Sequence, residues 1–201
     1  MVRPVGRPCE FDEGQALDAA MRAFWEGGYE ATGLDQLQSA TGVGRQSLYN
    51  KFGDKRALFL RCLVRYHERA VEGLRDLFVR KRPVADAFRA LFEGLLTEPD
   101  ADKRMGCFMV NTAMELARRD VEVGDLVARS QRGLEEAFFE ALQAGRGRGE
   151  LPASADSTAH DRATARFLVG ALLGVKVLTK SDPRSAAAAD MVRVTLDALR
   201  R

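Results

Sequence analysis

The stretch of sequence that decides the fold is residues 32–59, TGLDQLQSATGVGRQSLYNKFGDKRALF. It contains two short helical patterns, one ending near residue 41 and one covering 45–52, separated by the triplet Gly42-Val43-Gly44. In the second pattern Leu48 and Phe52 are four positions apart, which predicts one buried face. A helix, a three-residue glycine turn and a second helix are the parts of a helix-turn-helix.

Start and stop signals extend this pattern in both directions. Asp12, with Gln15 three residues later, is a suitable N-cap for a first helix that ends at Gly27-Gly28. Thr32-Gly33-Leu34-Asp35 matches the S/T-x-x-D/E signal for the start of the next helix. Asp54 is expected to cap a long fourth helix reaching about residue 81.

After Pro83 the periodicity stays helical, so the predicted class is all-α. We expect an N-terminal three-helix helix-turn-helix domain in residues 1–56, and a C-terminal helical bundle for ligand binding and dimerisation in 57–201. Helices in the bundle are predicted at about 84–97, 103–118, 121–145, 157–180 and 185–200.

Composition narrows the function classes. The chain has 201 residues, 46% hydrophobic and 30% charged, with a formal net charge of +2, which is ordinary for a globular protein. Cys9, Cys62 and Cys107 lack the spacing of a disulfide framework or a metal site, so we expect no metal and no cofactor. The N-terminus lacks the apolar core of a signal peptide, and no apolar run reaches the ~20 residues of a membrane helix. We therefore expect a cytoplasmic protein without a membrane partner.

The predicted second helix of the helix-turn-helix carries the side chains that suit double-stranded DNA. Such a helix enters the major groove with its N-terminal residues at the base edges. Arg45 can bond a guanine edge, and Gln46 an adenine edge. Tyr49, Lys51 and Lys55 can contact phosphates, and so can Thr32 with the free amides near it. Spacing alone leaves open that this is only a solvated face of a small helical hairpin.

These residues resemble the N-terminal domain of TetR-family transcriptional repressors. The shared elements are a threonine opening helix two, A-T-G-V at the turn, S-L-Y in helix three, and F-x-x-K-x-x-L-F entering helix four. The resemblance is specific over about thirty residues and weaker beyond them. The sequence departs from the family at Gly44, where members often have a serine N-cap.

The resemblance implies about nine helices, a homodimer, and a pocket in the larger domain that releases DNA when a small, mostly apolar effector fills it. The family mostly represses transcription. Position by position, the predicted DNA-binding set is Thr32, Gly33, Arg45, Gln46, Ser47, Tyr49, Asn50, Lys51 and Lys55.

Two further sets of residues are predicted in the C-terminal domain. Small residues four apart, Gly170 and Gly174, permit close helix approach, and in the family the last two helices form the dimer. Two sets of residues follow, an effector pocket and a dimer interface, and for each the alternative is that its residues simply pack in the chain's own core. The expected effector pocket is Leu63, Tyr66, His67, Phe88, Leu91, Phe92, Cys107, Val110, Asn111, Met114 and Phe138. The expected dimer interface is Phe167, Gly170, Ala171, Gly174, Val175, Leu178, Met191, Val194, Thr195 and Leu199.

Cys107 is predicted to be a reactive sensor thiol. It follows Lys103 and Arg104 at the predicted start of a helix, and both features favour a thiolate. The run 106–111, GCFMVN, resembles the subgroup of N-ethylmaleimide-responsive repressors, which implies release by an electrophile or oxidant. The alternative role is a small buried apolar filler. The alternative function for the whole chain is a helical-bundle redox protein or enzyme using Cys107, although no base lies near it in sequence.

Overall fold

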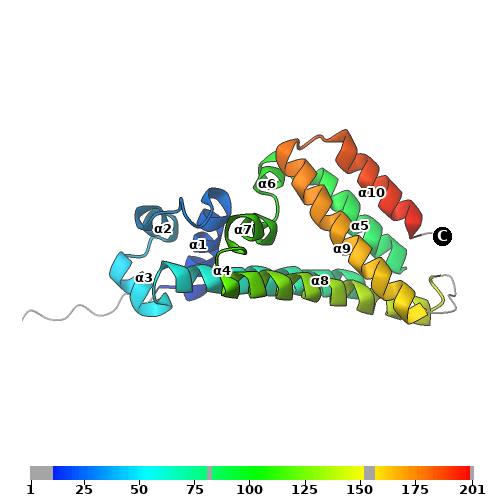
Figure 1. Ribbon diagram of the computed structural model, residues 1–201, viewed down its shortest axis with the longest axis horizontal. Coiled ribbons are helices and arrows are strands. Elements are labelled where there is room, and N and C mark those ends of the chain that lie inside the picture. The colour runs from blue at the N-terminus through cyan, green and yellow to red at the C-terminus, as the bar shows by residue number, and fades with distance from the viewer. Residues whose placement is uncertain (1–10, 81–82, 152–156, 200–201) are drawn as a thin grey trace, which may run out of the picture. The chain divides into compact units, whose positions relative to one another are not determined.

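The computed structural model describes residues 11–80, 83–151 and 157–199 (Figure 1). The N-terminal arm with Cys9 and the predicted end of helix four at Lys81 lie outside the described residues. Within these ranges every regular element is a helix, ten in all, and no strand occurs. The all-α prediction is confirmed. Among these helices none combines the length and apolar character that a bilayer crossing requires.

The chain divides into two compact units between Tyr66 and His67, within the long helix α4 (Lys55–Arg80). Unit 1 contains α1 (Glu13–Gly27), α2 (Leu34–Thr41), α3 (Arg45–Phe52) and the start of α4. Unit 2 contains the remainder of α4 together with six further helices. These are α5 (Val84–Thr97), α6 (Asp100–Met105), α7 (Phe108–Leu116), α8 (Val121–Gly147), α9 (Ser157–Ser181) and α10 (Ala186–Ala198).

Capping side chains set the helix starts in unit 1. The Asp12 carboxylate accepts the N–H of Gln15 at 2.9 Å and begins α1, as predicted. The Asp54 carboxylate accepts the N–H of Ala57 at 2.7 Å and begins α4. The predicted start of α2 is wrong by one residue. Its N-cap is Gly33, whose N–H donates to the side-chain oxygen of Gln36 at 2.8 Å.

The core of unit 1 is aromatic and aliphatic. Phe24 of α1 and Phe59 of α4 meet edge to face with ring centroids 5.0 Å apart, and both are buried. Arg65 of α4 donates to Asp18 of α1 at 2.6 Å and ties the two helices together. Cys62 is fully buried beside this pair, and burial, reinforced by the nearby Asp18 carboxylate, raises the pKa of its thiol. Cys62 therefore fills space in the core of unit 1.

Unit 2 is built on a larger core. The rings of Phe78, Phe88 and Phe138, from α4, α5 and α8, contact one another with centroid separations of 4.8 to 5.8 Å. Helix α9 packs on α8 and on α10, and α5, α9 and α10 lie side by side in Figure 1. The C-terminal helices thus belong to the chain's own core over much of their surface.

The prediction of one helix over 103–118 is wrong. The chain breaks at Gly106, which has φ +68°, into α6 and α7. A Cβ at Gly106 would lie 2.8 Å from Cδ of Lys180, so the aliphatic part of Lys180 covers the break. Lys103 on α6 is buried and donates to the carbonyls of Leu96 at 2.6 Å and Pro183 at 3.1 Å. These contacts join α6 to the end of α5 and to the turn before α10.

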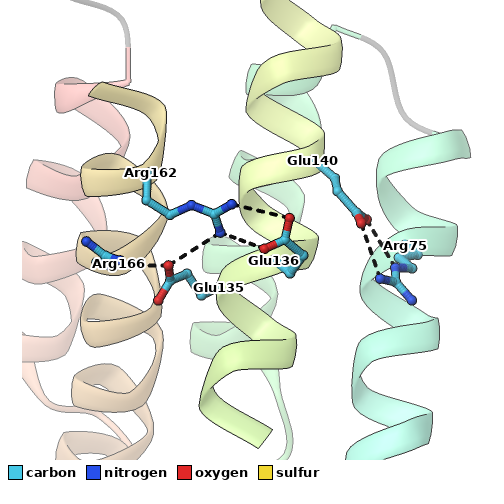
Figure 2. A network of polar contacts seen from close by, with 6 residues as sticks. All are labelled: Arg75, Glu135, Glu136, Glu140, Arg162 and Arg166. Carbon is cyan, nitrogen blue, oxygen red and sulfur yellow. Dashed lines mark hydrogen bonds and ion pairs between the residues drawn. The ribbon is translucent and has the colours of Figure 1, made fainter. Parts of the chain in front are cut away.

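Polar contacts connect α4, α8 and α9 on the outside of unit 2 (Figure 2). Arg162 of α9 donates to Glu136 at 2.6 Å and to Glu135 at 3.4 Å, and its guanidinium lies 3.7 Å from the ring centre of Phe139. The guanidinium holds the pKa of Glu136 below its usual value. A second pair joins α8 and α9: the half-buried Arg146 donates to the buried Asp161 at 2.6 Å.

Candidate nucleic-acid interface

Helix α3 has one buried and one exposed face. Leu48 and Phe52 are buried, as predicted, and fix the side that packs into unit 1. Arg45, Gln46, Asn50 and Lys51 are exposed, and Ser47 and Tyr49 are half-buried at the edges. Two apolar residues of this eight-residue helix therefore pack into the core, and the other six, all polar, cover the rest of its surface.

The turn before α3 is held by backbone geometry and one hydroxyl. Gly42 ends α2 with φ +67°, a conformation that glycine adopts without strain. The Thr41 hydroxyl donates to the Leu37 carbonyl at 2.7 Å and accepts the Val43 N–H at 3.2 Å. Val43 is buried. The N-cap of α3 is Gly44, which supplies no side-chain hydrogen bond, so the turn is fixed from the α2 side.

Two pairs of side chains lie along the exposed part of α3. The Nε2 of Gln46 donates to Oδ1 of Asn50 at 3.0 Å. The Arg45 guanidinium lies 5.9 Å from the ring centre of Tyr49. Within each pair the two residues are four positions apart, so their side chains lie next to each other on the same side of the helix.

The two lysines near the end of α3 have partners in unit 1. Lys51 forms an ion pair with Glu13 of α1. Lys55, the first residue of α4, donates to the Glu30 carbonyl at 3.3 Å, and its ammonium lies 4.5 Å from the ring centre of Tyr29. Sequence reasoning missed Glu13 and Glu30, because they lie 38 and 25 residues from their partners and no spacing rule connects them.

The structure does not place the Thr32 hydroxyl where a phosphate could reach it. Thr32 is 1% exposed, and its hydroxyl donates to the carbonyls of Gly28 at 2.6 Å and Ala23 at 3.3 Å. The prediction that this side chain contacts a phosphate is therefore wrong. Its hydroxyl instead connects the start of α2 to the end of α1. Gly33 beside it is exposed.

The short helix α2, the glycine turn and α3 follow one another, and α3 packs by two buried residues while its polar face is exposed. These are the features of a helix-turn-helix DNA-binding protein. Residues 16–62 match the family model of bacterial regulatory proteins of the tetR family, and residues 85–191 match the tetracyclin repressor-like C-terminal domain. The chain belongs to the TetR family of bacterial transcriptional regulators. Members of this family bind operator DNA and respond to ligands, so the alternative of an enzyme or redox protein using Cys107 is not favoured.

Relatives and solved structures agree with this assignment. The chain is 32% identical over 196 residues to the uncharacterised transcriptional regulator YezE of Bacillus subtilis, covering 97% of this chain and 100% of the relative. It is 34% identical over 155 residues to the transcriptional repressor ComR of Escherichia coli, covering 76% of this chain and 74% of ComR. A cysteine mutant of the regulator CifR, solved with a 26-base-pair operator DNA, superposes with a TM-score of 0.81 at 28% identity, covering 96% of this chain and 100% of that chain.

The structure separates the predicted pocket residues by environment. Leu63 and Tyr66 belong to unit 1, where Tyr66 meets Trp25 edge to face at 5.0 Å, and the other nine belong to unit 2. The fully buried rings of Phe88, Phe92 and Phe138 are part of the hydrophobic core of unit 2. Met114 is 86% exposed, so its placement in a pocket wall is corrected: it lies on the solvent side of α7. His67, Leu91, Val110 and Asn111 are half-buried.

His67 has an unusual environment among these residues. Its Nδ1 is buried and finds no hydrogen-bond partner among the described residues, and burial lowers the pKa of the imidazole. The ring lies against Gly133 of α8, where an added Cβ would overlap with Cε1 of His67. Gly133 therefore makes room for the imidazole.

Cys107 is buried and is the N-cap of α7. Lys103, expected to favour its thiolate, instead directs its ammonium at two backbone carbonyls. Asn111, one turn later, donates to the Met105 carbonyl at 2.9 Å and accepts from Lys180 at 2.8 Å. The segment that carries Cys107 is thus held on both sides of the break at Gly106.

The predicted dimer residues divide into three groups. Ala171, Val175 and Thr195 are buried within the chain, so their placement in an interface between copies is corrected. Phe167 of α9 and Val194 of α10 are 52% and 53% exposed, and Gly170 of α9 is also exposed. Gly174, Leu178, Met191 and Leu199 are half-buried.

Proposed function

We propose that the chain is an effector-responsive transcriptional repressor acting in the cytoplasm. Residues 1–56 would bind double-stranded operator DNA, and residues 57–201 would bind the effector and a second copy of the chain. The single observation that carries the DNA-binding part is α3, because Leu48 and Phe52 anchor it while its polar side chains face outward.

The DNA-contacting set consists of two kinds of residue. Arg45, Gln46, Ser47 and Asn50 lie on the part of α3 that would face base edges. Tyr49, Lys51 and Lys55 would contact phosphates, with the exposed backbone of Gly33. Lys51 and Lys55 would exchange their present partners for phosphates on binding.

Dimerisation would use the apolar residues that α9 and α10 leave exposed. Phe167, Val177 and Val194 are all about half exposed, and Gly170 and Met191 lie on the same two helices. Exposed apolar side chains on adjacent helices are typical of an interface between copies. Because the dimer has two-fold symmetry, the operator would be a near-palindrome with half-sites centred roughly 34–36 Å apart, or a multiple of that.

Effector binding would take place in unit 2 and would use the half-buried residues His67, Leu91, Val110 and Asn111 over the aromatic core. The effector would be small and apolar, or an electrophile that reacts with Cys107. The two kinds of effector are distinguished by treating the wild type and Cys107→Ser with a mild electrophile and measuring release of the operator. Release only in the wild type indicates the thiol, and equal release indicates a non-covalent ligand.

A gel-shift assay tests the proposed function as a whole, using DNA from upstream of the gene that encodes the chain. We expect a discrete complex that shifts at sub-micromolar protein and resists non-specific competitor DNA. Binding that the competitor abolishes would contradict a sequence-specific regulator.

A further inference from the structure

Two residues of α3 point most directly away from the core. Gln46 lies two residues before the buried Leu48, and Asn50 lies two residues before the buried Phe52. Two residues correspond to a rotation of about 200° around an α-helix. Gln46 and Asn50 are therefore one above the other on the side of α3 opposite to its anchor, and both are exposed.

The hydrogen bond between them fixes what each amide can offer to DNA. Nε2 of Gln46 donates to Oδ1 of Asn50 at 3.0 Å. The groups that this bond leaves wholly unused are the carbonyl Oε1 of Gln46, an acceptor, and the Nδ2 of Asn50, a donor, while Nε2 of Gln46 keeps one further N–H. The pair therefore offers Oε1 as an acceptor and Nδ2 as a donor, one from each residue.

Adenine is the base whose major-groove edge complements this set. Its N6 amino group donates and its N7 accepts, whereas guanine offers two acceptors, N7 and O6. Guanine at this position would place its O6 against Oε1 of Gln46, acceptor against acceptor. Thymine and cytosine offer only a single polar group there.

We propose that Gln46 and Asn50 act as one unit that reads a single adenine–thymine base pair in each half-site, an inference that rests on the proposed DNA-binding function. N6–H of adenine donates to Oε1 of Gln46, and Nδ2 of Asn50 donates to N7. The pairing lowers the entropy cost of binding, because each amide already holds the other in place. Arg45 and Tyr49 lie about 60–140° away around the helix and contact neighbouring positions.

The test is selection of binding sites from a random-sequence DNA library by the full-length wild type, Gln46→Ala, Asn50→Ala and the double variant. The wild type should prefer A·T at one position per half-site by roughly 5- to 150-fold. Each single variant should lose the preference at that same position. The double variant should lose little more, because the two residues act together. Both side chains are exposed, and circular dichroism checks that the variants fold.

Asn50→Asp provides a sharper variant. A carboxylate still accepts from Nε2 of Gln46 but has no donor for N7, so the preference should move from adenine towards cytosine, whose N4 amino group only donates. Lys55→Ala is the matched control and should retain the A·T preference at lower overall affinity.

The outcomes separate this inference from the function on which it rests. A wild type that selects no sequence overturns the DNA-binding function. A wild type that selects an operator, with Gln46→Ala and Asn50→Ala losing preference at different positions or keeping A·T at all of them, overturns the paired readout alone.

Discussion

The ammonium of Lys51 on α3 forms an ion pair with the carboxylate of Glu13 in the first turn of α1. The pair places a negative charge beside the helix that would enter the major groove. In the absence of DNA the carboxylate therefore neutralises a cation that phosphate would otherwise attract.

Removing that carboxylate should strengthen DNA binding. In Glu13→Gln, Lys51 can pair with a phosphate without first leaving Glu13, and one acidic repulsion disappears. We expect higher affinity at every salt concentration tested by titration, with a similar slope of log K against log salt, because Lys51 contacts a phosphate in both complexes. Glu26→Gln is the matched control, since Glu26 is at the other end of α1 and pairs only locally with Arg22. Equal effects from both variants would mean that net charge, not the Lys51 pair, is responsible.

Arg45 and Lys55 should affect binding in different ways. Arg45→Ala should weaken operator binding by about 1–3 kcal/mol and relax the preference at one position per half-site, as expected for a base contact. Lys55→Ala should weaken binding to all sequences alike and reduce the salt slope by about 1. Competition assays with operator and scrambled DNA measure both. If Lys55→Ala changed sequence preference and Arg45→Ala did not, the two roles would be reversed.

Val194→Glu should give monomers. It puts a charge on a half-exposed apolar position of α10 and leaves the core of unit 2 intact. Gly174 is a poorer choice, because an added Cβ there would lie 3.2 Å from the sulfur of Met191 in the same chain. Light scattering should show half the wild-type mass with unchanged helicity. Val121→Glu, at an 81% exposed position on α8, is the control that should remain dimeric. A dimeric Val194→Glu would place the interface elsewhere.

The pair of half-buried Arg146 and buried Asp161 should dominate the electrostatic contribution to stability. Asp161 is 1% exposed and accepts from Arg146 and from Gln143, both at 2.6 Å. Arg146→Met would leave this carboxylate without its cation and should lower the free energy of unfolding by about 3–5 kcal/mol in denaturant titrations. The exposed pair of Arg75 and Glu140 supplies the control (Figure 2). Arg75→Met should change stability by about 1 kcal/mol or less, and comparable losses in both variants would contradict the importance of burial.

His67 should make stability depend on pH. Burial lowers the pKa of its imidazole in the folded chain below the ordinary value of 6.5. The unfolded chain therefore binds a proton first as the pH falls through 6.5, and the folded state loses stability from there down to the lowered pKa. His67→Gln should remove this part of the pH dependence in unfolding curves. His160→Gln, at an exposed position of α9, should leave it in place. The same slope in wild type and His67→Gln would assign it to other groups.

Local signals in the sequence predicted most helix bounds. The third and fifth helices, expected at 45–52 and 84–97, are Arg45–Phe52 and Val84–Thr97. Their ends are set by adjacent glycines, prolines and apolar spacing, all of which are local. The class of the candidate site followed for the same reason, because α2, the turn and α3 are contiguous in the chain.

Contacts between distant segments explain the failures. The helix expected over 103–118 is broken where Lys180, more than seventy residues away, covers Gly106. Met114, expected in the wall of the effector pocket, is exposed on α7. Thr32 satisfies a start signal by sequence, yet its hydroxyl is used by the end of α1. The contact of Lys180 with Gly106 leaves no trace in spacing, and the ion pair between Glu13 and Lys51 was equally hidden.

The burial of Lys103 has a consequence for chemical labelling. Amine-acylating reagents modify lysines from solvent, and the ammonium of Lys103 is enclosed between the carbonyls of Leu96 and Pro183. Acylation there requires the corner formed by α5, α6 and the turn before α10 to open first, whereas exposed lysines such as Lys51 and Lys180 react directly. The rate at which this one amine is modified, followed by mass spectrometry, therefore reports how often unit 2 opens locally.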